Sequence, residues 1–339
     1  MSLDALASNV ASADPFGEQQ QPLLHEQAQV LGGLFVFETN SSHLLAIASH
    51  AYRDLPAHTF SHPPPRFTVR LLLTPAACVG GNELPQVRPL AGDGILCGAL
   101  DESSFAIIDP LRQSALLVVS ERMLQFPYHV RYELVEFAVY TLAARAQRLV
   151  PLHAACIGRN GRCLLLMGAS GAGKSTVTLQ CVLRGLDFLA EDSVLVQPES
   201  LLATGLASFL HLRHDSLRFV TSSVHAASIG NSPVIRRRSG VEKLEVDLRR
   251  SSHTLAPSPL CTVAVIFLSN DVAPGKPLLV PVHRDTLASR LAEDQQYAAT
   301  QPGWSAFERG LTLLPAFELR RSRHPLEAAE ALSELLESA

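Results

Sequence analysis

The sequence has few of the features that build disulfide-rich, zinc-binding or membrane-spanning proteins. Its six cysteines include no C-x-x-C pair, so neither a zinc site nor a redox motif is expected. The longest apolar stretches, such as residues 163–167 and 262–268, are too short to cross a bilayer. Residues 1–21 are acidic and rich in glutamine, without the basic and then apolar pattern of a signal peptide. These absences predict a protein of the reducing cytoplasm with no membrane partner.

Charge is also scarce and close to balanced. Charged residues make up 18% of the 339 residues, and the formal net charge is −4 at pH 7. A chain with this balance has no general attraction for nucleic acid, so no nucleic-acid partner is expected. Hydrophobic residues make up 47%, which is ordinary for a globular protein, and the length allows about two domains.

Turn residues and short apolar runs divide the chain into three predicted regions. Residues 1–25 are polar and are predicted to be a flexible N-terminus. Residues 26–130 alternate short apolar runs with Gly and Pro clusters, which predicts a β-rich α+β domain with few helices. Residues 131–339 are predicted to form a second domain of α/β type. Strands of the first domain are expected at residues 33–37, 67–73, 105–108 and 115–119.

The second domain is predicted to be a mixed sheet flanked by helices. Residues 132–149 carry an apolar stripe with helical spacing and should form one amphipathic helix. Residues 152–157 and 163–167 should form a hairpin, because the pair Asn160-Gly161 between them suits a tight turn. The other elements expected are a buried strand at residues 262–268 and a closing amphipathic helix at Pro325–Ser338.

The most informative stretch is GASGAGKST, which fits G-x-x-x-x-G-K-[ST], the phosphate-binding loop of nucleoside triphosphatases. An apolar strand precedes it, and residues 175–184 should form the following helix, ended by Gly185. In such a loop, backbone N–H groups surround the β-phosphate, the lysine reaches the β- and γ-phosphates and the serine contacts Mg²⁺. The residues expected to contact the nucleotide are Gly168, Ser170, Gly171, Ala172, Gly173, Lys174, Ser175 and Thr176.

Two acidic residues, Glu191 and Asp192, follow Lys174 by 17 and 18 residues and lie between two predicted short strands. A phosphotransferase needs carboxylates here for two tasks, to help hold Mg²⁺ and to accept the proton of the attacking hydroxyl. The pair can face the loop if its strand adjoins the strand before the loop. Adjacent residues on an extended strand point to opposite faces, so only one should reach the γ-phosphate unless the chain bends.

His153 precedes Gly168 by 15 residues and is expected on the first strand of the predicted hairpin. There it is either a histidine of the sheet, bonded to backbone, or part of a proton relay with one of the acids. The sequence leaves both alternatives open.

Basic residues gather further along the chain. His211 and Arg213 should lie on one side of an extended run. Residues 236–240, RRRSG, are followed by Lys243 and Arg249. This segment is either a solvated loop or a grip for phosphates or for the acidic flank of a protein substrate. Tyr297 and Trp304 are expected to be packing residues.

Together these pieces resemble the catalytic domain of HPr kinase/phosphorylase and its bacterial HPr-kinase-related homologues. The resemblance is specific between residues 151 and 194 and looser from residue 204 to 250. Before residue 130 the chain resembles the N-terminal part of related kinases found in peptide-modification gene clusters. The matching pieces are PLHAA from Pro151, GRNGR from Gly158, LLMGASGAGKST from Leu165, Arg184-Gly185 and LAEDSV from Leu189.

The resemblance implies a kinase that uses ATP and Mg²⁺ to phosphorylate a serine of a protein or peptide, for example a ribosomal peptide precursor. It implies that His153 is the active-site histidine. It also implies that Glu191 and Asp192 serve as catalytic base and Mg²⁺-linked carboxylate, with Glu191 standing where the family usually has Asp. Which of the two acids is the base stays open. Whether the chain forms a homo-oligomer also stays open. The implied catalytic residues are His153, Lys174, Glu191 and Asp192, and the implied metal-binding residues are Ser175 and Asp192.

Two other functions are compatible with a phosphate-binding loop. A small-molecule kinase of the shikimate or gluconate type also carries acids at a similar distance after its lysine, but such enzymes generally begin with the loop strand. Here 167 residues precede the loop. A non-catalytic nucleotide-binding regulator is the other alternative. The sequence contains no LSGGQ-type or N-K-x-D motif, which argues against the usual transporters and GTPases.

Overall fold

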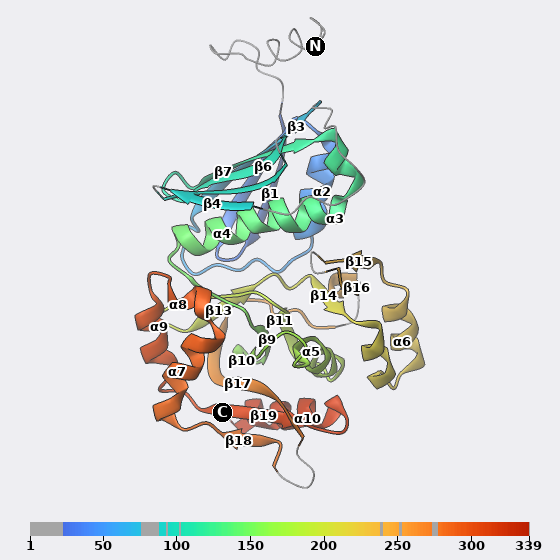
Figure 1. Ribbon diagram of the computed structural model, residues 1–339, viewed down its shortest axis with the longest axis vertical. Helices are drawn as coiled ribbons and strands as arrows, with labels where there is room; N and C mark the ends of the chain where they lie inside the picture. Colours follow the sequence, from blue (N-terminus) through green and yellow to red (C-terminus); the bar gives the residue numbers. More distant parts are fainter. Residues whose placement is uncertain are drawn as a thin grey trace, which may run out of the picture.

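The computed structural model describes residues 23–75, 88–92, 94–101, 103–237, 240–250, 253–272 and 277–338 (Figure 1). The fold is mixed α/β and contains three sheets. Most of the predicted flexible N-terminus, residues 1–22, lies outside the described residues, while Leu24 and His25 already belong to a strand. No helix of the described part is long and apolar enough to cross a membrane.

The first sheet has seven strands in the order β1-β2-β3-β7-β6-β5-β4. The expected strands are present as β2, β3, β6 and β7, whereas β1, β4, β5 and helix α2 (Ser42–Tyr52) were not predicted. Pairing is parallel between β2 and β3 and between β3 and β7, and antiparallel elsewhere. The strands are β1 (Leu24–Val30), β2 (Gly33–Thr39), β3 (Arg66–Thr74), β4 (Arg88–Gly92), β5 (Ile95–Asp101), β6 (Ser104–Asp109) and β7 (Ser114–Ser120).

A long helical segment packs against this sheet together with α2 (Figure 1). It consists of α3 (Pro127–His129), a π-helical stretch η2 (Val130–Glu136) and α4 (Phe137–Ala146). The expected helix at residues 132–149 was therefore wrong at both ends. Proline at the first helical position starts the segment earlier, and a positive φ of 54° at Arg148 takes the chain out of the helix.

Residues 130–149 pack into the core of the first sheet, with Leu134, Leu142 and Leu149 among the buried side chains. We therefore propose a domain boundary after residue 149 rather than at 130. Below, the N-terminal half means residues 23–149 and the phosphate-loop half means residues 150–338.

The second sheet has nine strands, in the order β11-β9-β10-β17-β13-β12-β8, with β19 paired to β17 and β18 to β19. Its central strand β10 is parallel to β17 and antiparallel to β9. The expected strand at residues 262–268 forms the middle of β17. The strands are β8 (Val150–Leu152), β9 (Ala155–Arg159), β10 (Arg162–Met167), β11 (Asp187–Ala190), β12 (Val194–Val196), β13 (Leu202–Gly205), β17 (Leu260–Val272), β18 (Leu279–Pro281) and β19 (Ala316–Arg321).

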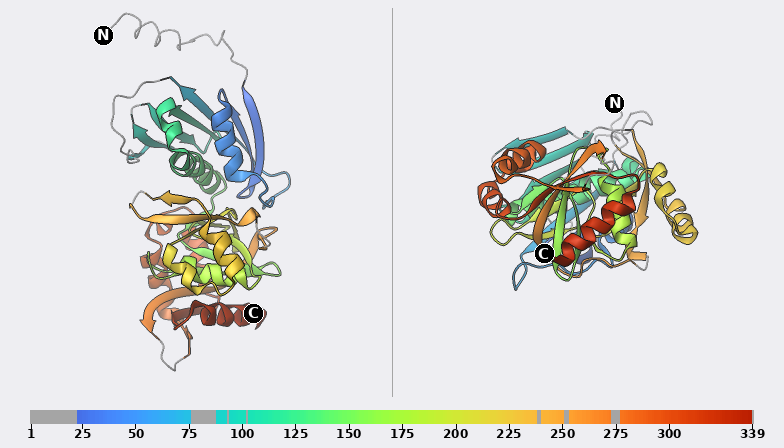
Figure 2. Two further views of the ribbon diagram at one scale, coloured as in Figure 1. Left: turned by 90° about the vertical axis from the view of Figure 1, so that its right-hand side faces the viewer. Right: turned by 90° about the horizontal axis from the view of Figure 1, so that it is seen from below.

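Helices cover both faces of this sheet, as Figure 2 shows. Leu164 and Leu166 of β10 pack under α5 (Lys174–Leu183) and α10 (Pro325–Ser338). The alternate residues Leu165 and Met167 pack on the opposite face, which is covered by α7 (Arg284–Asp294), α8 (Gln296–Ala299) and α9 (Trp304–Leu311). A strand that is buried on both faces has to be apolar throughout. This explains the apolar sequence of β10, directly before the predicted phosphate-binding loop.

The predicted hairpin is present but its first strand is shorter than expected. The turn between β9 and β10 uses Asn160 and Gly161 at φ of 54° and 79°, as a two-residue hairpin of type I′ requires. Residues 152–157 are not one strand, because β8 ends at Leu152, where the chain leaves its partner β12, and β9 begins at Ala155. His153 therefore lies in a bend and not on a strand, which corrects the expectation.

A small sheet lies between the N-terminal half and α5 (Figures 1 and 2). Its order is β14-β16-β15, formed by β14 (Phe209–Leu212), β15 (Val234–Arg236) and β16 (Glu242–Asp247). Leu210 and Leu244 on one face pack with Leu179 of α5. The alternate residues of β14 and β16 point to the other face, toward the N-terminal half. Around it lie η3 (His214–Phe219), α6 (Ser223–Gly230) and η4 (Leu248–Arg250).

A buried histidine fixes the N-terminal half to the second sheet. His58, on the connection between α2 and β3, is 2% exposed. Its Nδ1 lies 2.7 Å from Thr204 Oγ1, and its Nε2 lies 2.9 Å from the carbonyl oxygen of Ala256. Since a carbonyl oxygen only accepts, Nε2 carries the hydrogen and Nδ1 accepts from the threonine hydroxyl.

Candidate functional site

The loop after β10 has the backbone that its glycines predict. Gly168, Gly171 and Gly173 have φ of 145°, 86° and 101°, a range that other residues rarely adopt. Helix α5 (Lys174–Leu183) is followed by Gly185 at φ 80°. The N–H of Gly185 donates to the carbonyl oxygen of Val182, and the next N–H donates to that of Cys181. This is the pattern of a Schellman cap, so the predicted helix end is confirmed.

The loop forms one wall of an open cleft with a volume of about 830 Å³. Every residue expected to contact a nucleotide lines this cleft except Gly168. Basic residues outnumber acidic ones in the rest of the lining. Apart from residues 169–177, the cleft is lined by Tyr132, Glu133, His153, Asp192, His211, Arg213, Asp215, Ser216, Arg218, Phe219, Arg237, Val241, Lys243, Leu268, Ser269, Leu319, Arg320, Arg321, Ser322, Arg323, Pro325 and Ala328.

The Lys174 side chain is buried beside the loop. Its Nζ donates to the carbonyl oxygen of Gly168 at 2.5 Å and lies 3.1 Å from His153 Nε2. Burial lowers the pKa of Lys174 below its ordinary value, although the carboxylates of Asp192, Asp294 and Glu191 act in the opposite direction. A bound anion at the loop would favour the charged amine and could take over its hydrogen bonds.

The bend at His153 is held by the side chain of Gln295. The backbone N–H of His153 donates to Gln295 Oε1 at 2.7 Å, and its carbonyl oxygen accepts from Gln295 Nε2 at 3.0 Å. The imidazole is half exposed, and its Nδ1 lies 3.4 Å from Asp192 Oδ1. Lys174, His153 and Asp192 thus form a continuous series along the cleft wall.

Glu191 is buried and has a partner on every side. Its Oε1 accepts from Ser175 Oγ at 2.5 Å and lies 3.7 Å from Lys243 Nζ. Its Oε2 accepts from the backbone N–H of His211 at 2.9 Å and lies 3.0 Å from His211 Nδ1. Burial by itself would raise the pKa of Glu191, but the contacts with His211, Lys243 and Ser175 outweigh it and lower the pKa to about 2.

Asp192 follows directly and points into the cleft. Its side chain is 35% exposed, and its Oδ2 lies 3.9 Å from Arg237 Nη2, which is beyond hydrogen-bond distance. The acids do not follow a strand adjoining β10, because β9 lies between β11 and β10. Glu191 nevertheless contacts Ser175 of the loop and Asp192 lines the same cleft, because the chain bends between β11 and β12.

The basic residues predicted from the sequence divide into two groups. His211, Arg213 and Lys243 line the cleft, whereas Arg249 does not. Arg249 instead pairs with Asp247 and donates to two carbonyl oxygens at the end of α2. Of the segment 236–240, residues 238 and 239 lie outside the described residues, Arg236 is exposed at the end of β15, and Arg237 lines the cleft.

Arg237 is held in the cleft wall by a tyrosine from the N-terminal half. Its Nη1 donates to the hydroxyl of Tyr132 at 2.7 Å, and its side chain is 14% exposed. Within the described residues, its Nε and Nη2 are buried and have no hydrogen-bond partner. These two nitrogens form the edge of a guanidinium group that binds a carboxylate or phosphate in a bidentate way.

The sequence analysis missed several cleft residues. Tyr132 lies in the π-helical stretch of the N-terminal half, and Arg218 lies in η3. The basic run RRSR, residues 320–323, forms the end of β19 and the start of its connection to α10, and it lines the cleft. This run was visible in the sequence as a basic cluster directly before the predicted closing helix, and it would have been found by its charge.

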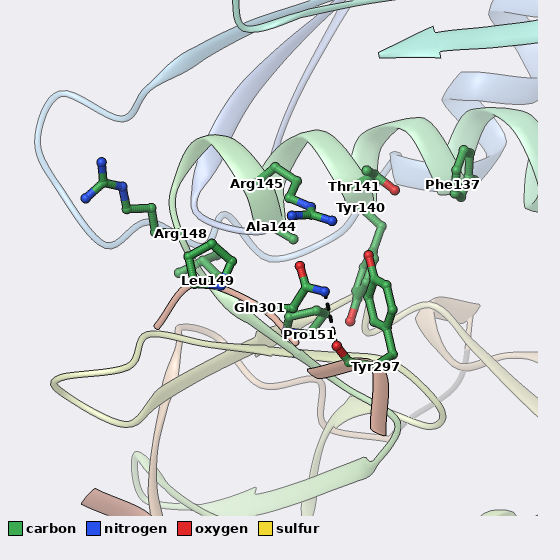
Figure 3. Close-up of a pocket in the computed structure, with 11 residues that line it drawn as sticks. Phe137, Tyr140, Thr141, Ala144, Arg145, Arg148, Leu149, Pro151, Tyr297 and Gln301 are labelled. Carbon is green, nitrogen blue, oxygen red and sulfur yellow. Dashed lines mark hydrogen bonds between the residues drawn. The ribbon is translucent and has the colours of Figure 1, made fainter. Parts of the chain in front are cut away.

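A second, smaller cavity of about 250 Å³ lies away from the loop (Figure 3). Its side chains come from α4 and the residues that follow it, up to Pro151 of β8, and from the segment around α8, and none of its residues lines the cleft. Trp304 is buried against Phe307, as expected of a packing residue. Tyr297 is 60% exposed and lines this cavity, so its expected packing role was wrong.

The described residues contain no cluster of three or more His, Cys, Asp or Glu side chains arranged to hold a metal ion. Near the loop, the Ser175 hydroxyl is bonded to the Glu191 carboxylate, and the Asp192 carboxylate lines the same cleft.

The chain matches no protein-family model and no curated protein sequence. Among solved structures it is similar to the Hpr(Ser) kinase/phosphatase from Coxiella burnetii, with 12% sequence identity and a TM-score of 0.26. That match covers 56% of this chain and 97% of the other. A similarity of this size assigns neither an activity nor residue roles, which therefore have to be argued from the geometry.

Proposed function

We propose that this chain is a kinase that transfers the γ-phosphate of ATP to a serine hydroxyl of a protein or peptide. The observation that supports it most is the series Lys174, His153 and Asp192, which leads from a phosphate-binding loop to an exposed carboxylate in the same cleft. A regulator that only binds nucleotide has no need of an exposed acid beside the loop lysine. A kinase needs one to accept the proton of its acceptor.

The cleft suits a nucleoside triphosphate in size and charge. Its volume of about 830 Å³ falls in the range of roughly 300–1,000 Å³ that is common for small-molecule sites. Backbone N–H groups of the loop and the N-terminus of α5 would bind the phosphates, and Lys174 would exchange the Gly168 carbonyl for phosphate oxygens. Arg320, Arg321 and Arg323 also line the cleft and would add positive charge.

The oxygen donors beside the loop fit Mg²⁺, a hard cation that takes few protein ligands when phosphates and water supply the others. Ser175 would hold it, and Glu191 would orient the Ser175 hydroxyl through their hydrogen bond. When bound, Mg²⁺ neutralises charge on the transferred phosphate.

The surroundings of the two acids favour Asp192 as the base. Glu191 has a pKa of about 2 and all of its oxygens are occupied, so it is a poor proton acceptor. Asp192 is partly exposed to the cleft, and its oxygens have fewer and longer contacts, with His153 Nδ1 at 3.4 Å and Arg237 Nη2 at 3.9 Å. In the proposed transfer, the serine hydroxyl gives its proton to Asp192 as its oxygen bonds to the γ-phosphorus. The bond from the γ-phosphorus to the bridging oxygen breaks, and ADP leaves.

The test is a transfer assay with labelled ATP and Mg²⁺ that compares three acceptors: serine-containing peptides, hydroxylated metabolites and water. Label on a peptide serine, lost when that serine is replaced by alanine, supports the proposal. Label that reaches only metabolites identifies a small-molecule kinase, and release of free phosphate alone identifies an ATPase. Either result overturns the proposed function.

A further inference from the structure

Two arginine–carboxylate pairs lie on the face of the small sheet that points to the N-terminal half. In the register of β14 and β16, Phe209 is opposite Asp247 and His211 is opposite Glu245. Arg131 and Arg249 both lie over the Phe209 ring, with their Cζ atoms 4.2 and 4.8 Å from its centroid. Arg131 pairs with Glu245, and Arg249 pairs with Asp247. The two pairs thus have similar surroundings and composition.

Only one of the pairs continues to the phosphate loop. Glu245 Oε1, which accepts from Arg131, also lies 3.2 Å from His211 Nε2. The other ring nitrogen of His211 lies 3.0 Å from Glu191 Oε2, and Glu191 Oε1 accepts from the hydroxyl of Ser175. An unbroken series of contacts therefore joins a helix of the N-terminal half to the loop serine.

The other pair ends within the N-terminal half. Arg249 Nη1 donates to the carbonyl oxygens of His50 and Arg53, each at 2.9 Å, at the end of α2. Among the described residues, Asp247 accepts from the backbone and side chain of Arg249 and lies 3.5 Å from Arg250 Nε. This pair joins the halves without any contact to Glu191.

The series that starts at Arg131 is closed to water. At most 9% of the side chain of Arg131, Glu245, His211 or Glu191 is exposed. Arg131 is held in turn by Glu136, whose Oε1 lies 3.1 Å from its Nε. These residues are five apart, which the π-helical stretch allows by widening one turn. When one member is truncated, its buried neighbours lose a hydrogen-bond or charge partner.

We propose that Arg131, Glu245 and His211 are positioning residues, which fix the Glu191 carboxylate and through it the Ser175 hydroxyl for a nucleotide bound with Mg²⁺. The inference rests on the proposed function, because it assumes that Ser175 belongs to a nucleotide site. It assigns a role to the N-terminal half, which supports the phosphate loop through Arg131. Removal of a residue that holds a metal ligand in place commonly weakens metal binding by about 10–100-fold.

The experiment compares matched variants of the two pairs in the full chain. Arg131→Gln and Glu245→Gln interrupt the series to the loop, whereas Arg249→Gln and Asp247→Asn interrupt the pair that ends at α2. The affinity for a fluorescent ATP analogue is measured as a function of Mg²⁺ concentration, and the midpoint of thermal unfolding is measured for each variant without ligand.

Arg131→Gln and Glu245→Gln are each expected to need at least about tenfold more Mg²⁺ for half-maximal nucleotide binding. The two variants of the second pair should also lower the unfolding midpoint, but their Mg²⁺ requirement should stay within about twofold of the unchanged protein. Equal Mg²⁺ requirements in all four variants would show that Arg131 only stabilises the fold, and the inference would be wrong. Failure of the unchanged protein to bind the analogue would instead refute the proposed function itself.

Discussion

Glu191 and Asp192 are neighbours in the chain but lie in opposite surroundings. Glu191 faces inward, where Ser175, His211 and Lys243 occupy its oxygens and water is excluded. Asp192 faces the cleft, is one third exposed, and lies 3.4 Å from His153 Nδ1 and 3.9 Å from Arg237 Nη2. The bend between β11 and β12 separates them. The difference indicates that a pair of adjacent acids can divide two tasks, one acid holding the loop and the other meeting the acceptor.

The largest effect, on the rate of phosphate transfer, is expected from Asp192→Asn, at the acid that faces the cleft. It removes the proposed base, and loss of general-base catalysis typically slows transfer by about 10²–10⁴-fold. Nucleotide binding should remain measurable, and because the side chain is partly exposed, stability should change by less than about 0.5 kcal/mol. The measurement is single-turnover phosphate transfer beside nucleotide titration. Full transfer activity in this variant would refute the assignment of the base.

A different result is expected from Glu191→Gln, because Glu191 is buried on the inner side of the bend. The variant keeps the size of the side chain but removes the charge that binds His211 and Lys243. We expect a requirement for about tenfold more Mg²⁺ in nucleotide binding and a loss of roughly 2 kcal/mol in the free energy of unfolding. Binding titrations and chemical unfolding measure the two. If Glu191→Gln and Asp192→Asn behaved alike in both measurements, the division of tasks between the acids would be wrong.

Arg237 lies beside Asp192 in the cleft and is expected to contact the acceptor peptide. Its Nε and Nη2 lack partners within the described residues, and it lies 3.9 Å from Asp192. We expect its charge to attract an acidic side chain near the acceptor serine, because Arg237 lines the cleft. Arg237→Gln should therefore raise the KM for a peptide with acidic residues beside the serine by about tenfold, and by less for a neutral peptide.

Arg249→Gln is the matched control for that comparison, since Arg249 lies outside the cleft. A drop in kcat with every acceptor, at constant KM, would contradict the expectation and assign Arg237 to the transferred phosphate instead.

The local parts of this site could be predicted from the sequence. The run before the loop, the glycines, the helix with its Gly185 cap and the acids between two strands depend on neighbouring residues, and the structure contains all of these elements. The bend at His153 could not be predicted, because it depends on a side chain 142 residues away, Gln295.

The support of Glu191 could not be predicted either. Arg131, His211 and Glu245 come from three elements far apart in the chain, and no local spacing relates them. His211 stood inside the apolar run FLHL of β14, where a lone polar residue signals a buried partner. The identity of that partner followed only from the pairing of β14 with β16.

The smallest expected effect is the contribution of the buried Glu191 to the pH dependence of the free energy of unfolding. The contacts of Glu191 lower its pKa in the folded protein from 4.5 to about 2, so between these values the unfolded chain binds a proton that the folded chain does not. The stabilisation is complete above about pH 4.5 and is lost as the pH falls toward 2. Glu191→Gln should remove this part of the acid sensitivity, roughly 1 kcal/mol between pH 4.5 and 3.5. Chemical unfolding at both values without Mg²⁺ measures it, with Asp192→Asn as the matched variant outside the buried set. An unchanged pH dependence in Glu191→Gln would mean that the carboxylate is not held as tightly as its contacts indicate.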